Sequence, residues 1–285
     1  MATPAPSSAR HGGLVWLASY PKSGNTWLRH FLHALIQPEA GAPDINAMNL
    51  LTTGDNGARW YQPLLQGPLA EADMATVAAV RPQAIRTIAR ATDGLVFVKT
   101  HNALVAHLGT PMIDMSVTAG AVYVVRNPLD VAISYASFMG VSIDRAIELM
   151  NTDGSIIENT DKHAYEYRGS WREHVNSWTR RPARQLHVMR YEDMLEKPLE
   201  AFTKLGNFLR LGRTRRQIEA AIAASSFEKL QQQEEEAGFR ERPETMERFF
   251  RAGKAGQWRD VLCAAQIDAI VAANAEQMAR FGYKP

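Results

Sequence analysis

The segment from Leu14 to Trp27, LVWLASYPKSGNTW, constrains the possible folds more than any other stretch of the sequence. The continuous apolar run Leu14–Ala18 is typical of a buried strand, and it ends before Pro21, which cannot donate a hydrogen bond within a sheet. A short loop with Lys22 and a single glycine follows, and then apolar residues recur at helical spacing. In a strand–loop–helix arrangement of this kind, the loop and the N-terminus of the helix present free backbone N–H groups and a partial positive charge at one place. This arrangement predicts a phosphate-binding loop.

The loop differs from the common nucleoside-triphosphate loop, G-x-x-x-x-G-K-[ST], in which the lysine follows the second glycine. Here Lys22 precedes Gly24, the only glycine of the loop. Taken alone, the tetrapeptide P-K-S-G favours an ordinary strand-to-helix turn with a solvated lysine. The polar residues farther along the chain favour a phosphate-binding loop.

Two further apolar runs, at residues 95–98 and 121–125, and a fourth predicted strand at residues 186–191 alternate with helical patterns. Strands that are apolar throughout and alternate with helices indicate a parallel sheet covered on both faces. We therefore predict an α/β fold, a single domain with a central, mostly parallel sheet flanked by helices. Ligands of such folds bind beyond the carboxyl ends of the strands, and four polar side chains follow those ends: Lys22, Lys99, His101 and Arg126. Their collection at one edge indicates an anionic ligand.

The remaining pattern predicts mostly helices and loops. Helical spacing covers residues 27–36, 128–138, 169–178, 198–209, 218–224 and 265–281, and residues 71–91 read as one or two helices broken at Pro82. Residues 39–67 have the composition of a loop rather than a strand, so we expect residues 40–69 to form either a wall or lid of a substrate pocket or a solvated insertion. Gln231–Glu236 is expected to be a solvated helix face or a mobile turn. Asp130 and Asp193 lie at predicted helix starts, where capping accounts for them.

Composition excludes several classes of protein. The net charge of +2 is too small to indicate a nucleic-acid or membrane partner, so any positive field must be local. The single cysteine, Cys263, excludes an internal disulfide and suits a reducing compartment. No apolar segment is long enough to span a bilayer, and the first residues lack the apolar core of a signal peptide. We expect a soluble, cytoplasmic protein with a disordered tail at residues 1–12 and one domain at residues 13–285.

The strand ends favour sulfuryl transfer over phosphoryl transfer. Phosphoryl transfer normally uses Mg²⁺ held by an acidic strand-end residue, whereas the predicted strand ends here carry Lys, His and Arg, and no metal-spaced His/Cys/Asp cluster is evident. A sulfuryl group carries one negative charge fewer, so lysines and amide donors suffice to stabilise charge on the leaving oxygen without a metal. We interpret His101 as the general base for an acceptor hydroxyl rather than as a structural histidine, because it lies on this edge beside Lys99.

Seven segments in the same order resemble the cytosolic sulfotransferase family, which uses 3′-phosphoadenosine 5′-phosphosulfate (PAPS). YPKSGNTW resembles the family's 5′-phosphosulfate loop, FVKTH its strand with the catalytic lysine and histidine, and VVRNPLDVAISYASF its 3′-phosphate segment. FFRAGKAGQW resembles its C-terminal RKGxxGxW flap, and GSWREHVNSW, RYEDM and SSFEKL resemble further family segments. The resemblance covers residues 14–258. It implies a P-loop-like sulfotransferase fold, an enzyme of bacterial type, and PAPS as the co-substrate that is converted to PAP without a metal.

The resemblance also implies a role for each matching residue. The implied catalytic set is His101 as base, Lys99 and Lys22 at the sulfuryl group and the leaving oxygen, and Ser134. The 5′-phosphosulfate is implied to bind the loop residues Lys22, Ser23, Gly24, Asn25 and Thr26, and the adenine to lie among Trp27, Tyr191, Ser225 and Phe227. The 3′-phosphate is implied to bind Arg126 and Ser134, beneath a flap that contains Phe250, Arg251, Ala252 and Gly253.

Three features depart from the family pattern. Asn25 replaces the usual threonine, and Ala252 replaces the flap lysine, for which Lys254 is a candidate substitute. The family's dimer motif, K-x-x-x-T-V-x-x-x-E, reads here Arg259-x-x-x-Cys263-Ala264-x-x-x-Asp268. A homodimer stays an open alternative, because the charged ends of this motif are kept and its centre is lost.

The acceptor is implied to be a small molecule, an alcohol or phenol and less favourably an amine. Its pocket is expected within residues 41–69, 102–119 and 140–168, and apolar residues in or beside these ranges suggest a hydrophobic compound, although core packing would explain several of them equally: Trp60, Tyr61, Leu104, Met112, Phe138 and Met139. Two alternatives remain, a P-loop nucleotide kinase or other phosphotransferase, and a non-catalytic binder of the sulfonucleotide. The misplaced lysine and the missing carboxylate count against the first, and the presence of both Lys99 and His101 counts against the second.

Overall fold

The computed structural model describes residues 13–37, 44–48 and 51–285 of the chain. The predicted tail at residues 1–12 lies outside the described residues, as do residues 40–43 and 49–50 of the predicted lid. Within the described part of the chain, no helix is both long and apolar enough to cross a membrane.

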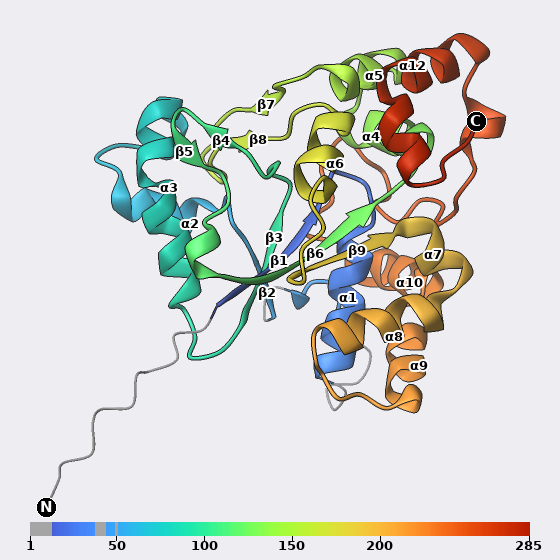
Figure 1. The fold of residues 1–285 in the computed structure, drawn as a ribbon, viewed down its shortest axis with the longest axis horizontal. Coiled ribbons are helices and arrows are strands. Elements are labelled where there is room, and N and C mark those ends of the chain that lie inside the picture. The colour runs from blue at the N-terminus through green and yellow to red at the C-terminus, as the bar shows by residue number, and fades with distance from the viewer. Residues whose placement is uncertain (1–12, 38–43, 49–50) are drawn as a thin grey trace, which may run out of the picture.

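A five-stranded sheet organises the molecule (Figure 1). Its strands are β1 (Leu14–Ser19), β2 (Thr52–Gly54), β3 (Val96–Thr100), β6 (Thr118–Val125) and β9 (Leu186–Arg190), in the spatial order β2-β3-β1-β6-β9. Every pairing in this sheet is parallel, and Leu17 of β1 lies opposite both Lys99 of β3 and Val122 of β6. The carboxyl ends of the strands therefore meet at one edge, and the predicted fold class is confirmed.

Helices cover both faces of the sheet because alternate residues of β1 point to opposite sides. Val15 and Leu17 pack in a core with α1 (Asn25–Ile36), α7 (Tyr191–Glu196), α8 (Pro198–Phe208) and α9 (Arg215–Ala224). Leu14 and Trp16 pack in a second core with α3 (Met74–Ala89), α4 (Pro128–Met139), α6 (Trp171–Thr179) and α12 (Ala264–Arg280). Both cores share the sheet, so the described residues form one domain.

Shorter elements connect these layers, mostly around the carboxyl ends of the strands. They are α2 (Ala58–Tyr61), α5 (Ile143–Asn151), α10 (Phe227–Ala237), α11 (Trp258–Val261), the 3₁₀ helices η3 (Gln62–Leu64), η4 (Leu69–Glu71) and η5 (Met115–Val117), and the short strands β4 (Ala106–His107), β5 (Thr110–Pro111), β7 (Ile156–Ile157) and β8 (Glu166–Tyr167). The helices predicted near residues 27–36, 128–138, 169–178, 198–209, 218–224 and 265–281 are confirmed within a few residues.

Two predictions about residues 39–91 are wrong. Residues 52–54, predicted to lie in a loop, form β2, because a segment this short acquires strand character only by pairing with β3. Residues 71–91 are not broken at Pro82, since α3 continues through it. The buried Arg81 donates to the Tyr61 hydroxyl at 3.0 Å and to the carbonyl of Tyr165 at 2.7 Å. Packing of this kind outweighs the cost of roughly 3 kcal/mol that an interior proline imposes on a helix.

Candidate active site

A cavity of about 730 Å³ opens at the carboxyl edge of the sheet. Its walls come from the ends of β1, β2, β3, β6 and β9, from the start of α1, and from residues 240–257. The predicted strand-end residues Lys22, Lys99, His101 and Arg126 all line it. The predicted collection of cations and donors at one edge is therefore correct.

The loop between β1 and α1 has the backbone of an anion-binding turn. Lys22 has a φ of 66° and Gly24 a φ of 103°, both in the left-handed region. A Cβ atom at Gly24 would lie 2.6 Å from the ring of Tyr191, so only glycine lets this loop pack there. The hydroxyl of Ser23 is buried without a hydrogen-bond partner among the described residues. An orphaned hydroxyl beside free helix N–H groups fits a ligand that supplies oxygen acceptors.

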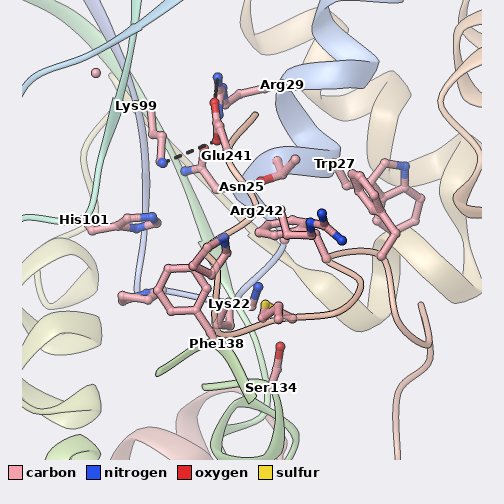
Figure 2. Close-up of a pocket in the computed structure, with 18 of the residues that line it drawn as sticks. Lys22, Asn25, Trp27, Arg29, Lys99, His101, Ser134, Phe138, Glu241 and Arg242 are labelled. Carbon is pink, nitrogen blue, oxygen red and sulfur yellow. Dashed lines mark hydrogen bonds and ion pairs between the residues drawn. The ribbon is translucent and has the colours of Figure 1, made fainter. Parts of the chain in front are cut away.

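The ammonium of Lys22 is crowded by other cations. Its Nζ lies 3.9 Å from the ring centroid of Phe249 and 4.8 Å from that of Phe138. Figure 2 shows Phe138 beside Lys22. Burial, followed by the charges of Arg126, Lys99 and Arg251, lowers the pKa of Lys22 to about 7. An anion placed at this point would relieve the repulsion and restore the charge of the lysine.

Arg126 joins the loop to the C-terminal part of the chain. Its guanidinium donates to the carbonyl of Lys22 at 3.0 Å and to the carbonyl of Lys254 at 3.1 Å, and it lies 4.2 Å from the ring centroid of Tyr191. Its Nε is buried without a partner among the described residues. Lys22 and Arg126 are thus close enough to contact one ligand.

His101 has the tautomer that a general base requires. Its Nδ1 lies 2.7 Å from the carbonyl oxygen of Ser19, and because a carbonyl only accepts, Nδ1 carries the proton. The lone pair is therefore on Nε2. Burial, followed by the charge of Lys99, lowers the pKa of His101 to about 3, so the ring stays neutral at physiological pH.

Lys99 is paired with a carboxylate that sequence analysis missed. Figure 2 shows Lys99 and Arg29 converging on Glu241. The Lys99 Nζ lies 3.7 Å from Glu241, and Arg29 donates to both oxygens of Glu241 at 2.8 and 2.9 Å. Arg29 also donates to the hydroxyl of Thr52 at 3.0 Å, and these cations hold the pKa of Glu241 at about 2. A permanent carboxylate therefore holds Lys99 at the edge of the cavity.

Two buried carboxylates hold the flap, defined here as residues 249–258. Asp130, assigned from sequence to helix capping, accepts the backbone N–H groups of Gly256 at 2.7 Å and Trp258 at 3.1 Å. Glu234, in a segment predicted to be solvated, accepts those of Phe249 at 2.7 Å and Phe250 at 2.9 Å. Both contacts join residues far apart in the sequence, so local patterns carry no signal for them.

Most of the predicted site residues line this cavity. Besides the four strand-end residues they are Gly24, Asn25, Thr26, Trp27, Ser134, Tyr191, Phe227, Phe250, Arg251, Ala252 and Gly253. Ser23 and Ser225 are not among the lining residues, and the Ser225 hydroxyl donates instead to the carbonyl of Ala221 at 2.8 Å. Lys254, the candidate substitute for the flap lysine, is exposed and also absent from the lining.

Asn25 lines the cavity and also forms hydrogen bonds with strand β1. Its side-chain amide donates to the carbonyl of Leu17 at 2.8 Å and to the hydroxyl of Ser19 at 3.3 Å. These contacts tie the start of α1 to the end of β1. Asparagine thus maintains the strand–loop–helix turn at the position where the family pattern has threonine.

The apolar residues that suggested a hydrophobic acceptor lie mostly outside the cavity. Of those six, only Phe138 lines it, and Tyr61 and Met112 are completely buried in the core. The cavity contains instead several charged residues that sequence analysis did not assign to the site: Arg29, Arg59, Glu158, Lys162, Glu166, Arg168, Arg240, Glu241 and Arg242. Among the described residues no group of three or more His, Cys, Asp and Glu side chains is arranged to hold a metal ion.

The parallel sheet and the cationic loop at its edge define a P-loop-like, anion-binding α/β protein. Residues 13–282 match the family model described as the sulfotransferase domain. Among curated proteins, the chain is 26% identical over 273 residues to a flavonol 3-sulfotransferase of Flaveria bidentis, covering 91% of this chain and 80% of that protein. It is 28% identical over 278 residues to the cytosolic sulfotransferase 13 of Arabidopsis thaliana, covering 91% of this chain and 76% of that protein.

Solved structures support the same fold. A retinol dehydratase solved with androsterone and inactive cofactor PAP superposes with a TM-score of 0.63 at 21% identity, covering 93% of this chain and 80% of that one. The mouse sulfotransferase SULT7A1 solved with PAP gives a TM-score of 0.61 at 19% identity, covering 94% and 84%.

The chain belongs to the sulfotransferase family. Family membership confirms the predicted PAPS-dependent sulfotransferase, with PAPS as the co-substrate and PAP as the product. The two sulfotransferases compared by sequence come from plants and SULT7A1 comes from the mouse, and the bacterial and cytoplasmic assignments stay predictions.

Proposed function

We propose that the domain formed by residues 13–285 transfers the sulfuryl group of PAPS to a hydroxyl of a small molecule, with His101 as general base. The observation that carries this proposal is the free Nε2 of a neutral His101 at the same edge as two lysines. The acceptor oxygen forms a bond to sulfur while the bond from sulfur to the 5′-phosphate oxygen breaks. The hydroxyl proton moves to His101 Nε2 and is later released to water, and PAP leaves with the bonding electron pair.

In this proposal each cation binds a different charged group of the nucleotide. Lys22 and the backbone N–H groups of its loop stabilise the developing charge on the leaving oxygen, and Lys99 stabilises the sulfuryl oxygens. Arg126, with Ser134 and Arg251, binds the 3′-phosphate, which distinguishes PAPS from ATP-like nucleotides. Support comes from the short distances between Lys22, Arg126 and the flap.

One assay tests the proposal. The protein is incubated with PAPS carrying labelled sulfate and a panel of hydroxyl acceptors, with and without EDTA. We expect transfer of label that survives EDTA in the wild type and is lost with His101→Ala while PAP affinity is kept. Metal-dependent transfer from ATP, or an equal loss of PAP affinity and rate in His101→Ala, would contradict the assigned chemistry.

A further inference from the structure

The order of the strands separates the nucleotide side of the cavity from the acceptor side. Lys22, Arg126 and Tyr191 follow β1, β6 and β9. His101 follows β3, on the other side of β1, and among the described strands of this sheet β2 alone lies beyond β3. If the proposed function holds, an acceptor hydroxyl at His101 lies near the cavity-lining residues of 53–59 and 157–168, which we call the acceptor wall; Phe138, Met246 and Phe249 line the same cavity.

The acceptor wall is almost entirely polar. Ile157 and Ala164 are its only apolar side chains among the described residues. Its polar members are Thr53, Asn56, Arg59, Glu158, Thr160, Lys162, His163, Glu166 and Arg168. A wall for a flat apolar ring would need apolar surface here, because hydrophobic burial is proportional to the apolar area removed from water.

The polar groups at the base of the wall are held in fixed positions. Asn56 Nδ2 donates to Glu166 Oε1 at 2.8 Å, and Arg168 Nε donates to Glu166 Oε2 at the same distance. Arg168 donates further to the Tyr135 hydroxyl at 3.3 Å. The backbone is also tied, because Ala164 N–H donates to the carbonyl of Asn56 at 2.7 Å. Donors and acceptors are therefore pre-positioned without rearrangement of the wall.

Such a wall selects for hydroxyl-rich molecules. An apolar acceptor would remove water from the exposed polar side chains of the wall, such as Arg59, Lys162 and His163, and would return no hydrogen bonds, which costs free energy. A polyol replaces each lost water with a hydroxyl that both donates and accepts. The formal charges nearly balance, with Arg59, Lys162 and Arg168 against Glu158 and Glu166, so the wall does not favour a strongly charged acceptor.

We propose that the natural acceptor is a neutral polyhydroxylated molecule of the sugar or cyclitol class. The expectation of a hydrophobic acceptor depended on apolar residues that mostly pack in the core instead. This inference rests on the proposed function, since it concerns which hydroxyl is presented to His101.

Transfer of label from PAPS to matched acceptors tests this inference. The panel pairs cyclohexanol with inositols, and 2-naphthol with neutral hexosides and with a glucuronide. We expect kcat/KM for the best neutral polyol to exceed that for cyclohexanol and for 2-naphthol by tenfold or more, and that for the glucuronide to be lower. A naphthol or cyclohexanol that is sulfated faster than every neutral polyol overturns the inference and leaves the proposed function intact. Absence of PAPS binding, or of transfer to any acceptor, overturns both.

Two variants of the acceptor wall sharpen the test. With Asn56→Leu we expect kcat/KM for the polyol to fall tenfold or more, mainly through KM, and to fall at least fivefold more than the value for cyclohexanol, while the affinity for PAP stays within twofold. Asn207→Leu makes the same chemical change on the exposed face of α8 and should alter none of these quantities. Glu166→Gln, nearly isosteric, gives a second test should Asn56→Leu fold poorly. Equal losses for the polyol and cyclohexanol would overturn the inference.

Discussion

The charge state of Lys22 should depend on whether the nucleotide is bound. In the protein without ligand, burial and the neighbouring cations lower the pKa of Lys22 to about 7. At pH 8 about nine-tenths of these lysines are then neutral, and at pH 6 about one-tenth. Binding of an anionic nucleotide raises the pKa again, so the lysine takes up a proton on binding. The affinity for PAP should accordingly fall as pH rises above 7, by up to about tenfold per pH unit.

Calorimetry in buffers of different ionisation enthalpy measures this proton directly. We expect an uptake of about 0.9 proton per PAP bound at pH 8 and of about 0.1 from Lys22 at pH 6. At pH 8 the phosphates of PAP are already ionised, because their second pKa is about 6, so they contribute little. Lys22→Arg is the matched control, since arginine keeps its charge throughout this range.

The Lys22→Arg variant also gives the result that would refute the predicted proton uptake by Lys22. With Lys22→Arg the uptake at pH 8 should vanish and the affinity should become nearly independent of pH between 7 and 9. If the wild type takes up no proton at pH 8, or if both proteins take up the same amount, the crowding of cations around Lys22 has no such effect.

Three further predictions concern the same site. His101→Ala should lower kcat by about 10²–10⁴-fold with PAP affinity within twofold, measured by labelled transfer and calorimetry; a tenfold loss of affinity would contradict its role as base. Arg126→Ala should weaken PAP more than tenfold beyond its effect on adenosine 5′-phosphosulfate, which lacks the 3′-phosphate; equal effects on the two ligands would remove Arg126 from the 3′-phosphate site. Glu241→Ala should lower the free energy of unfolding by about 1–3 kcal/mol, because Arg29 is only 2% exposed and its buried donors lose their acceptor. Urea denaturation measures this loss, and Glu235→Ala, which breaks the exposed pair of Glu235 with Arg248, is the control. We expect Glu235→Ala to lower the free energy of unfolding by less than about 1 kcal/mol. Equal losses in the two variants would show that the buried Arg29 pair contributes no more than an exposed one.

The sequence predicted four of the five strands of the sheet, the nucleotide loop and the residues at the strand ends, because each depends on local features. The run Leu14–Ala18 is apolar throughout and therefore becomes a buried strand, and Gly24 is needed where φ is positive. Lys99 and His101 directly follow another apolar run, so their position at the carboxyl edge follows from the parallel sheet. These predictions needed no knowledge of distant contacts.

Predictions failed where long-range contacts decide the structure. β2 has three residues with no apolar pattern, and it is a strand only because β3 offers an unpaired edge. Pro82 stays within a helix because helix residues before and after it, such as Arg81 and Ala84, are buried. Asp130 and Glu234 look like ordinary surface carboxylates in the sequence, yet each accepts two backbone N–H groups of the flap.

By itself the sequence determined that this chain forms a parallel α/β sheet with a cationic, glycine-containing loop at its edge, since strand and helix periods and turn residues are local properties. Only the tertiary structure decided which charges meet in the cavity. Glu241 reaches Arg29 from 212 residues away, and the polar acceptor wall forms because residues 53–59 and 157–168 pack beside His101. The specificity of the site depends on these contacts between residues far apart in the sequence, because the energies of ion pairs and hydrogen bonds are set by distance in space.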